Sequence, residues 1–202
     1  MLIANSKLIG TPILSVASGP LGFITGSIVN PDNLKIIAFR LEGPHIGKND
    51  PNILDVSSIR EYASKLGMII DNADELILKD EVVKIKQVLE LNFDLINLKV
   101  ETKKHSKLGH IIDYTVSPGD YSVQQIIVKR PMIKSFSDPR LTINRKEIIE
   151  VTDYKVIIKD ELKTIKERAE KEDFIPNFVN PFRKSEQDFA PADNQTPAGK
   201  GS

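Results

Sequence analysis

The residues of this 202-residue chain that could do chemistry include three histidines: His45, His105 and His110. A zinc site needs three or four convergent ligands, and the spacing of these histidines does not supply them. The chain has no cysteine, which excludes disulfides, thiolate nucleophiles and cysteine-based metal sites. We therefore interpret the histidines as surface residues, and we predict neither a metal nor a cofactor.

Carboxylates and glycines give no stronger signal for catalysis. Asp71, Asp74 and Glu75 fall in an expected turn, and nothing in the sequence marks an apolar pocket around them, so we interpret them as solvated turn residues. No serine stands in a recognisable Ser-His-Asp arrangement. The segment 22–26 is not a phosphate loop, because no Lys-Ser or Lys-Thr pair follows it. We predict that the protein is not an enzyme.

Charge is balanced overall, at 28 basic and 28 acidic residues, but it is unevenly distributed. Residues 95–158 hold 11 basic and 7 acidic side chains, whereas residues 1–94 hold 9 and 12. The basic residues gather near two expected loops: Lys103, Lys104 and Lys107 lie near one, and Lys129, Arg130, Lys134, Arg140, Arg145 and Lys146 lie around the other. Together they could contact phosphates or an acidic partner. The alternative is that they only complement the acidic first stretch or keep the chain soluble.

The elements that would position these residues occur twice. A shift of 87 residues places Leu8-Ile9 on Leu95-Ile96 and Leu21-Gly22 on Leu108-Gly109. The same shift places Leu54 on Leu141 and Val56 on Ile143, and a shift of 88 places the segment 68–71 on 156–159. We interpret the chain as a tandem duplication.

Each copy is expected to form short β-strands. In the second copy, residues 98–102 alternate apolar and polar side chains, and residues 109–116 are rich in β-branched types. Ser117–Asp120 supplies a turn before a return strand at 121–129, as Asn30–Asn33 does before 34–41. About five short strands per copy favour a small barrel or sandwich, since closure removes exposed edges. The apolar join at 81–93 could be a final strand, a short helix or both in succession, and it predicts a rigid connection.

The C-terminal part has a different composition. Oppositely charged residues four apart between 159 and 173 predict a short, exposed helix. Phe174, Phe178 and Phe182 follow, before a polar stretch typical of a disordered tail. These aromatics could fold back onto the same chain, dock on a partner or contact a membrane surface.

A known family matches several of these residues. The segment Leu8-Ile9-Gly10-Thr11-Pro12-Ile13, followed by Gly22-Phe23-Ile24, resembles the opening of a PRC-barrel domain. The second copy repeats the pattern, with Asn97 where the family usually has Gly; Asn also tolerates positive φ. Gly22 and Gly109 are expected at the tight bend between the first two strands. The resemblance covers residues 6–80 and 93–160.

This resemblance implies small β-barrels that contact proteins or RNA, without enzyme activity. The family is named for the cytoplasmic domain of the photosynthetic reaction-centre H subunit, and a related domain occurs in a maturation factor of the small ribosomal subunit. We therefore expect an all-β chain of two tandem small PRC-like β-barrels, at 1–92 and 93–160, with a short C-terminal helix and a disordered tail at 161–202.

The leading hypothesis is a non-enzymatic cytoplasmic adaptor that contacts a protein partner. The second hypothesis is an RNA- or ribosome-associated factor that binds through the basic second barrel. No apolar run approaches the ~18 residues of a transmembrane helix, and the oligomeric state stays open. The predicted partner-binding residues are Lys103, Lys104, Lys107, Arg130, Lys134, Phe174, Phe178 and Phe182.

Overall fold

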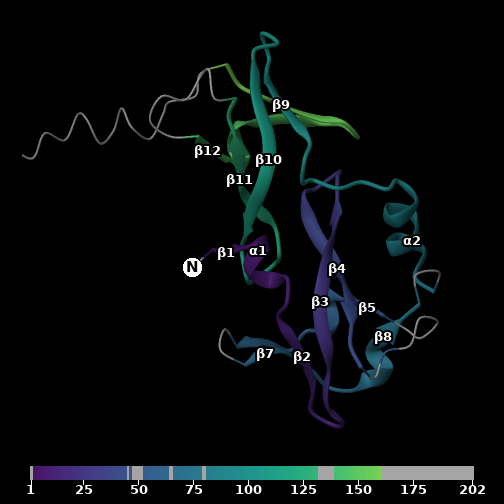
Figure 1. Ribbon diagram of the computed structural model, residues 1–202. Helices are drawn as coiled ribbons and strands as arrows, with labels where there is room; N and C mark the ends of the chain where they lie inside the picture. Colours follow the sequence, from purple (N-terminus) through teal and green to yellow (C-terminus); the bar gives the residue numbers. More distant parts are fainter. Residues whose placement is uncertain are drawn as a thin grey trace, which may run out of the picture. The chain divides into compact units, whose positions relative to one another are not determined.

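The computed structural model describes residues 2–44, 46, 52–63, 66–78, 81–131 and 139–160, which are mostly β (Figure 1). The expected all-β class is thereby confirmed. The helix and tail expected at 161–202 lie outside the described residues.

The first half of the chain forms a seven-stranded sheet with the order β6-β7-β2-β3-β4-β5-β8. Its two long central strands are the hairpin that the sequence predicted around Asn30–Asn33. The strands are β2 (Pro12–Ser15), β3 (Gly19–Asn30), β4 (Lys35–Glu42), β5 (Ile53–Asp55), β6 (Glu61–Ala63), β7 (Gly67–Ile70) and β8 (Leu76–Ile77).

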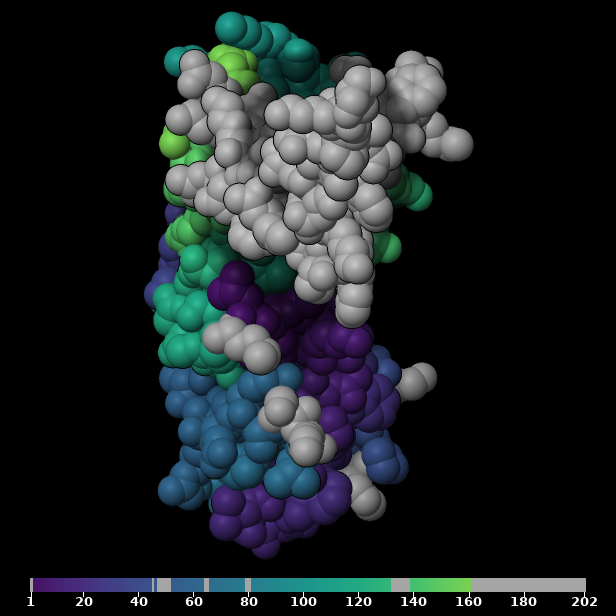
Figure 2. Space-filling view, turned by 90° about the vertical axis from the view of Figure 1, so that its left-hand side faces the viewer, coloured from purple at the N-terminus to yellow at the C-terminus, as the bar shows by residue number. Residues whose placement is uncertain are grey.

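The second half forms another seven-stranded sheet, with the order β12-β11-β10-β9-β14-β13. Its seventh strand comes from the N-terminus: β1 (Ile3–Ala4) pairs with β10, and the short helix α1 (Asn5–Leu8) follows it. Figure 2 shows these purple N-terminal residues beside teal residues of the second half. The other strands are β9 (Lys99–Thr102), β10 (Lys107–Val116), β11 (Val123–Lys129), β12 (Arg140–Asn144), β13 (Ile148–Val151) and β14 (Lys155–Ile158).

The two sheets repeat one topology. The strands β2 to β7 correspond in order to β9 to β14, and both sheets place a single parallel pair at the same point, β2–β7 and β9–β14. In that pair Ile13 lies opposite Met68, and Val100 lies opposite Val156. These partners are related by the shifts of 87 and 88 residues that the sequence predicted.

The repeat predicted for the fourth strand is wrong by two residues. Phe39 pairs with Leu54, and its equivalent Ile126 pairs with Ile143, so the shift here is 89. Leu54 therefore corresponds to Ile143 and not to Leu141. The reason is that the second half has two more residues between equivalent positions of its third and fourth strands, and apolar periodicity alone fits either register.

The position expected for two glycines is also wrong. Gly22 and Gly109 lie inside β3 and β10, opposite Ile13 and Val100, and not at the bend. A β-bulge precedes each of them. A Cβ at either glycine would collide with a backbone carbonyl oxygen of the next strand, that of Glu42 or that of Lys129. The glycines are needed for this close approach of two strands.

Both sheets are open within the described residues, and they share one hydrophobic core. No pairing joins β6 to β8 or β12 to β13 in the described part of the chain, so barrel closure stays an expectation. Buried residues of both halves, from Leu8 to Ile158, belong to a single cluster. Both sheets lie in one compact unit, Met1–Leu162, and the boundaries placed at 92 and 160 stay predictions.

The join between the halves contains a helix, α2 (Val83–Glu90), one of the alternatives left open by the sequence. Its buried residues Ile85 and Val88 pack on Ile28, Ala38 and Ile53, which project from β3, β4 and β5. The first sheet is therefore covered by the core on one face and by α2 on the other.

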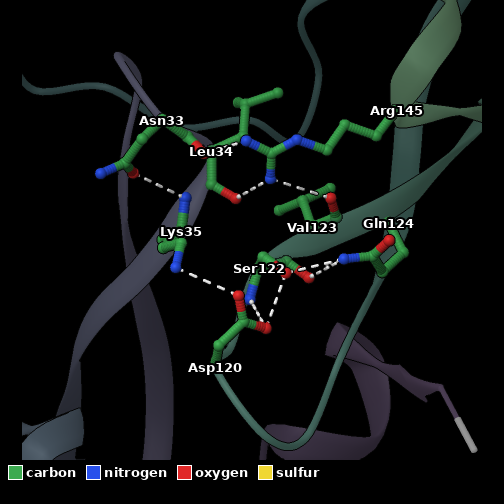
Figure 3. Close-up of polar contacts among 8 residues, drawn as sticks. All are labelled: Asn33, Leu34, Lys35, Asp120, Ser122, Val123, Gln124 and Arg145. Atoms are coloured by element: carbon green, nitrogen blue, oxygen red, sulfur yellow. Dashed lines mark hydrogen bonds and ion pairs between the residues drawn. The ribbon is translucent and has the colours of Figure 1, made fainter.

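The two halves are tied together at their hairpin turns (Figure 3). The Lys35 Nζ lies 3.1 Å from an Asp120 carboxylate oxygen, and the Phe39 and Tyr121 rings meet edge to face, with centroids 5.7 Å apart. From the short 3₁₀ turn Arg145–Glu147, the Arg145 guanidinium donates to the carbonyl oxygens of Asn33, Leu34 and Val123.

Candidate binding surface

Four of the predicted site residues lie at one end of the second sheet. Lys103 and Lys104 form the turn between β9 and β10, Lys107 begins β10, and Arg130 follows the end of β11. The turn is held by its backbone, because the N–H groups of Lys103 and Lys104 donate to the Ile158 carbonyl and to the Asp160 carboxylate. The three lysine side chains are exposed. Lys134, Phe174, Phe178 and Phe182 lie outside the described residues.

A row of basic residues crosses the same sheet next to this turn. Strand register places each member directly opposite the next, on five adjacent strands. Adjacent strands are ~4.8 Å apart, so the row spans about 19 Å. We call it the basic row; in order across the sheet its members are Arg140, Lys129, His110, Lys99 and Lys155.

The basic row lies on the outer face of the second sheet. Each member is adjacent in sequence to a buried residue that faces the core; these residues are Val100, Ile111, Val128, Leu141 and Val156. Successive side chains of a strand point to opposite faces, so the row points outward. Four of its members are exposed and Lys155 is partly buried.

Three of the five members of the basic row, Lys99, His110 and Lys129, form no ion pair with a carboxylate in the described part of the chain. Lys155 Nζ lies 3.5 Å from a Glu101 carboxylate oxygen. Lys129 lies opposite Arg140 and Lys99 lies opposite Lys155, an arrangement of basic residues that costs a sheet stability wherever the facing charges are not compensated.

The first sheet shows that the fold does not require this charge. The positions equivalent to Lys99, His110, Lys129 and Lys155 hold Pro12, Phe23, Glu42 and Gly67. Phe23 lies opposite both Pro12 and Glu42, so the same row exists there without a single cation. The basic row is therefore a property of the second half only.

The outer faces also differ in what covers them. The residues beneath α2 in the first sheet, Ile28, Ala38 and Ile53, correspond to Thr115, Gln125 and Thr142 in the second. A helix packed on such polar residues would gain little apolar burial. Within the described ranges, the four-residue helix α1 contacts β10, where Ser6 hydrogen-bonds the Asp113 carboxylate, but no helix as long as α2 packs on this face. The second sheet thus presents a polar, cationic outer face.

Aromatic rings accompany the cations. His110 belongs to the basic row, and His105 lies in the adjoining turn with a φ of 61°. Tyr154 is 66% exposed, and Lys155 Nζ lies 5.8 Å from the centre of its ring. The surface therefore combines positive charge with exposed planar groups.

The sequence predicted the turn lysines and Arg130 but missed the row itself. The sequence groups Lys129 and Arg140 around one loop, but only the pairing of strands brings them into line with Lys99, His110 and Lys155. One signal was available in the sequence: each of these basic residues is adjacent to an apolar residue that the predicted alternation places in the core.

A cavity of about 390 Å³ lies where both halves meet; Ser27 of the first half and Tyr114 of the second both line it. Its other ionisable lining residues are Arg40 and Asp94. Burial raises the pKa of the Tyr114 phenol well above its usual range, against the smaller opposing effect of a hydrogen bond with Ser27. The phenol therefore stays protonated at physiological pH and is a poor base or nucleophile.

The described ranges contain neither a metal-binding cluster nor a membrane-spanning helix. No cluster of three or more His, Asp or Glu side chains there could hold a metal ion. No helix in the same part of the chain has the length and apolar character needed to cross a membrane.

Comparison with known proteins gives no assignment: the chain matches no protein-family model and no curated protein. Function is therefore inferred from the geometry and charge of the surface.

Proposed function

We propose that the protein is a non-enzymatic binding protein that contacts an anionic macromolecule through the basic outer face of its second sheet. The observation that carries this proposal is the basic row, five aligned residues that the equivalent strands of the first half do not have. A line of basic residues in one of two equivalent sheets favours contact with negative charge, because the fold itself does not require it.

The turn residues extend this surface. Lys103, Lys104 and Lys107 project from the same end of the sheet on a rigid backbone. A cationic surface on a rigid element loses little conformational entropy when it binds, which favours recognition. We also propose that the chain is related to PRC-barrel domains, that it acts as an adaptor and that it is located in the cytoplasm.

Retention on heparin, a polyanion, tests the proposal. The variant Lys99→Gln/Lys129→Gln removes two charges from the row, and Lys7→Gln/Lys84→Gln removes two exposed charges elsewhere. We expect the row variant to elute at clearly lower salt than the wild type, and the control to elute close to the wild type. Equal elution of the two variants would show that only net charge matters and would overturn the proposed function.

A further inference from the structure

We infer that the anionic partner is a single-stranded nucleic acid, whose phosphates contact the basic row and whose bases stack on the exposed rings beside it. This inference rests on the proposed function and specifies its partner. Three observations favour it over an acidic protein: the linear order of the cations, the aromatic rings next to them, and the predominance of polar side chains on the described part of the face.

The linear order suits a polyanionic backbone. The row spans about 19 Å across the strands, and the turn that bears Lys103 and Lys104, with Lys107 beside it, lies a few residues further along β9 and β10. A strand laid along these cations would keep several successive phosphates near positive charge. Proteins that bind single strands combine such a cationic track with stacking side chains.

The rings lie where stacking would be needed. His110 is in the middle of the row, and Tyr154 adjoins Lys155 at one end, with 66% of its surface exposed. His105 adds a third ring at the turn, held with positive φ by a hydrogen bond from its own N–H to the Thr102 carbonyl, 2.8 Å.

Apolar side chains are few among the described residues of the same face: Ile127 and Ile157 point outward between core residues of β11 and β14, and both are partly buried. Thr115, Gln125 and Asn144 form another row across it, linked by side-chain hydrogen bonds of 3.4 and 3.3 Å. Protein–protein interfaces concentrate their binding energy in desolvated aromatic and Arg anchors and are depleted of Lys at their centre. A face built from lysines and amides fits a solvated phosphate backbone better.

Fluorescence anisotropy with the full chain and labelled ligands tests the inference. The ligands are a 20-nucleotide oligouridylate, the oligothymidylate of the same length, the corresponding duplex and a 20-residue polyglutamate. We expect both single strands to bind more tightly than the duplex and the polyglutamate. With about five phosphate contacts, affinity should fall about 100-fold between 50 and 200 mM salt.

Two sets of variants separate charge from stacking. Lys99→Gln/Lys129→Gln should reduce the slope of log affinity against log salt by about 1.4, while Lys99→Arg/Lys129→Arg and the control Lys7→Gln/Lys84→Gln should leave it unchanged. Tyr154→Leu should weaken binding at least about fivefold with the slope unchanged. Circular dichroism and thermal unfolding confirm that each variant is folded.

Tighter binding of polyglutamate or of the duplex would overturn the inference, as would single-strand binding that is insensitive to the row. If the row controls heparin retention but polyglutamate is the tighter ligand, the proposed function stands and only the nucleic-acid assignment fails. If heparin retention is also insensitive to the row, both fail.

Discussion

Leu34 and Tyr121 are 87 residues apart and hold equivalent positions, each bonded to the opposite half of the molecule. The Val123 N–H donates to the Leu34 carbonyl at 2.8 Å, and the Ile36 N–H donates to the Tyr121 carbonyl at 3.0 Å. Both residues have positive φ, 49° and 52°. Such reciprocity is typical of the isologous interface of a symmetric dimer, here formed within one chain.

Arg145 breaks this symmetry and should contribute to stability. Its guanidinium donates to carbonyls of both halves, so Arg145→Ala should lower the free energy of unfolding by about 1.5–3 kcal/mol, as expected for hydrogen bonds made by a charged group. Urea unfolding measures the change. Lys146→Ala, an exposed neighbour in the same turn, should change the free energy of unfolding by less than about 0.5 kcal/mol. Similar losses for both variants would contradict the assigned role.

Two glycines of the second half should differ sharply in their tolerance of alanine. Gly109→Ala places a Cβ against the Lys129 carbonyl at a φ of 142°, so we expect a large loss of stability or failure to fold. Gly119→Ala meets no atom within 4 Å at an ordinary φ and should be neutral or stabilising by up to about 1 kcal/mol. Thermal unfolding of both variants checks this, and a stable Gly109→Ala protein would refute the close approach.

Gly10 and Asn97 test the repeat at the level of single residues. They are 87 residues apart and have φ of 84° and 69°. The Gly10 N–H donates to the Ile24 carbonyl, and the Asn97 N–H donates to the equivalent carbonyl of Ile111. Gly10→Ala should cost roughly 1 kcal/mol, because a Cβ disfavours positive φ. Asn97→Ala should cost less, because Asn already has a Cβ and only its tolerance of positive φ is lost, and Asn97→Gly should retain stability. A clear loss of stability in urea unfolding of Asn97→Gly would argue against equivalent backbones.

Asp120 should make the inter-half contact sensitive to acid. Hydrogen bonds from Ser122, and then the nearby Lys35, lower the pKa of this carboxyl from 3.8 to about 2. Because the folded-state pKa is the lower one, ionised Asp120 stabilises the protein fully above pH 3.8, and this contribution fades as the pH falls toward 2. The difference in unfolding free energy between wild type and Asp120→Asn should therefore shrink below pH 4.

Urea unfolding at pH 7, 5 and 3 measures that difference. Lys35→Gln is the comparison variant, since it removes the ion pair but leaves the Ser122 hydrogen bond of 2.7 Å in place. The difference in unfolding free energy between wild type and Lys35→Gln should change less with pH than the difference between wild type and Asp120→Asn. A difference between wild type and Asp120→Asn that does not change with pH would exclude Asp120 as the titrating group.

The sequence was sufficient for the strands of the two central hairpins and for most of the repeat, because these follow from local patterns, whereas β1, β6, β8 and β13 were not predicted. Alternation at 98–102 and turn chemistry at Asn30–Asn33 and Ser117–Asp120 identify β9 and the two central hairpins directly. The two-residue error at Leu141 arose because apolar alternation repeats every second residue, so a slip of two keeps every side chain on its face.

The candidate surface was only partly predictable for a different reason. Lys103, Lys104 and Lys107 are close in sequence and were identified together. Lys99 and Lys129 become neighbours of His110 only through the pairing of β9, β10 and β11, which single-sequence patterns do not specify. The pairing of β1 with β10 was missed for the same reason, since its partners are over 100 residues apart.

Chemical-shift mapping by NMR tests the central claim most directly. Isotope-labelled full-length protein would be titrated with the 20-nucleotide oligouridylate and the backbone amide shifts followed. The account predicts that the largest changes fall on Lys99, His110, Lys129, Arg140 and Lys155 and on the adjoining turn, while the equivalent residues Pro12–Ile13, Phe23 and Glu42 of the first sheet remain unchanged. Changes confined to the first sheet or to α2 would contradict it.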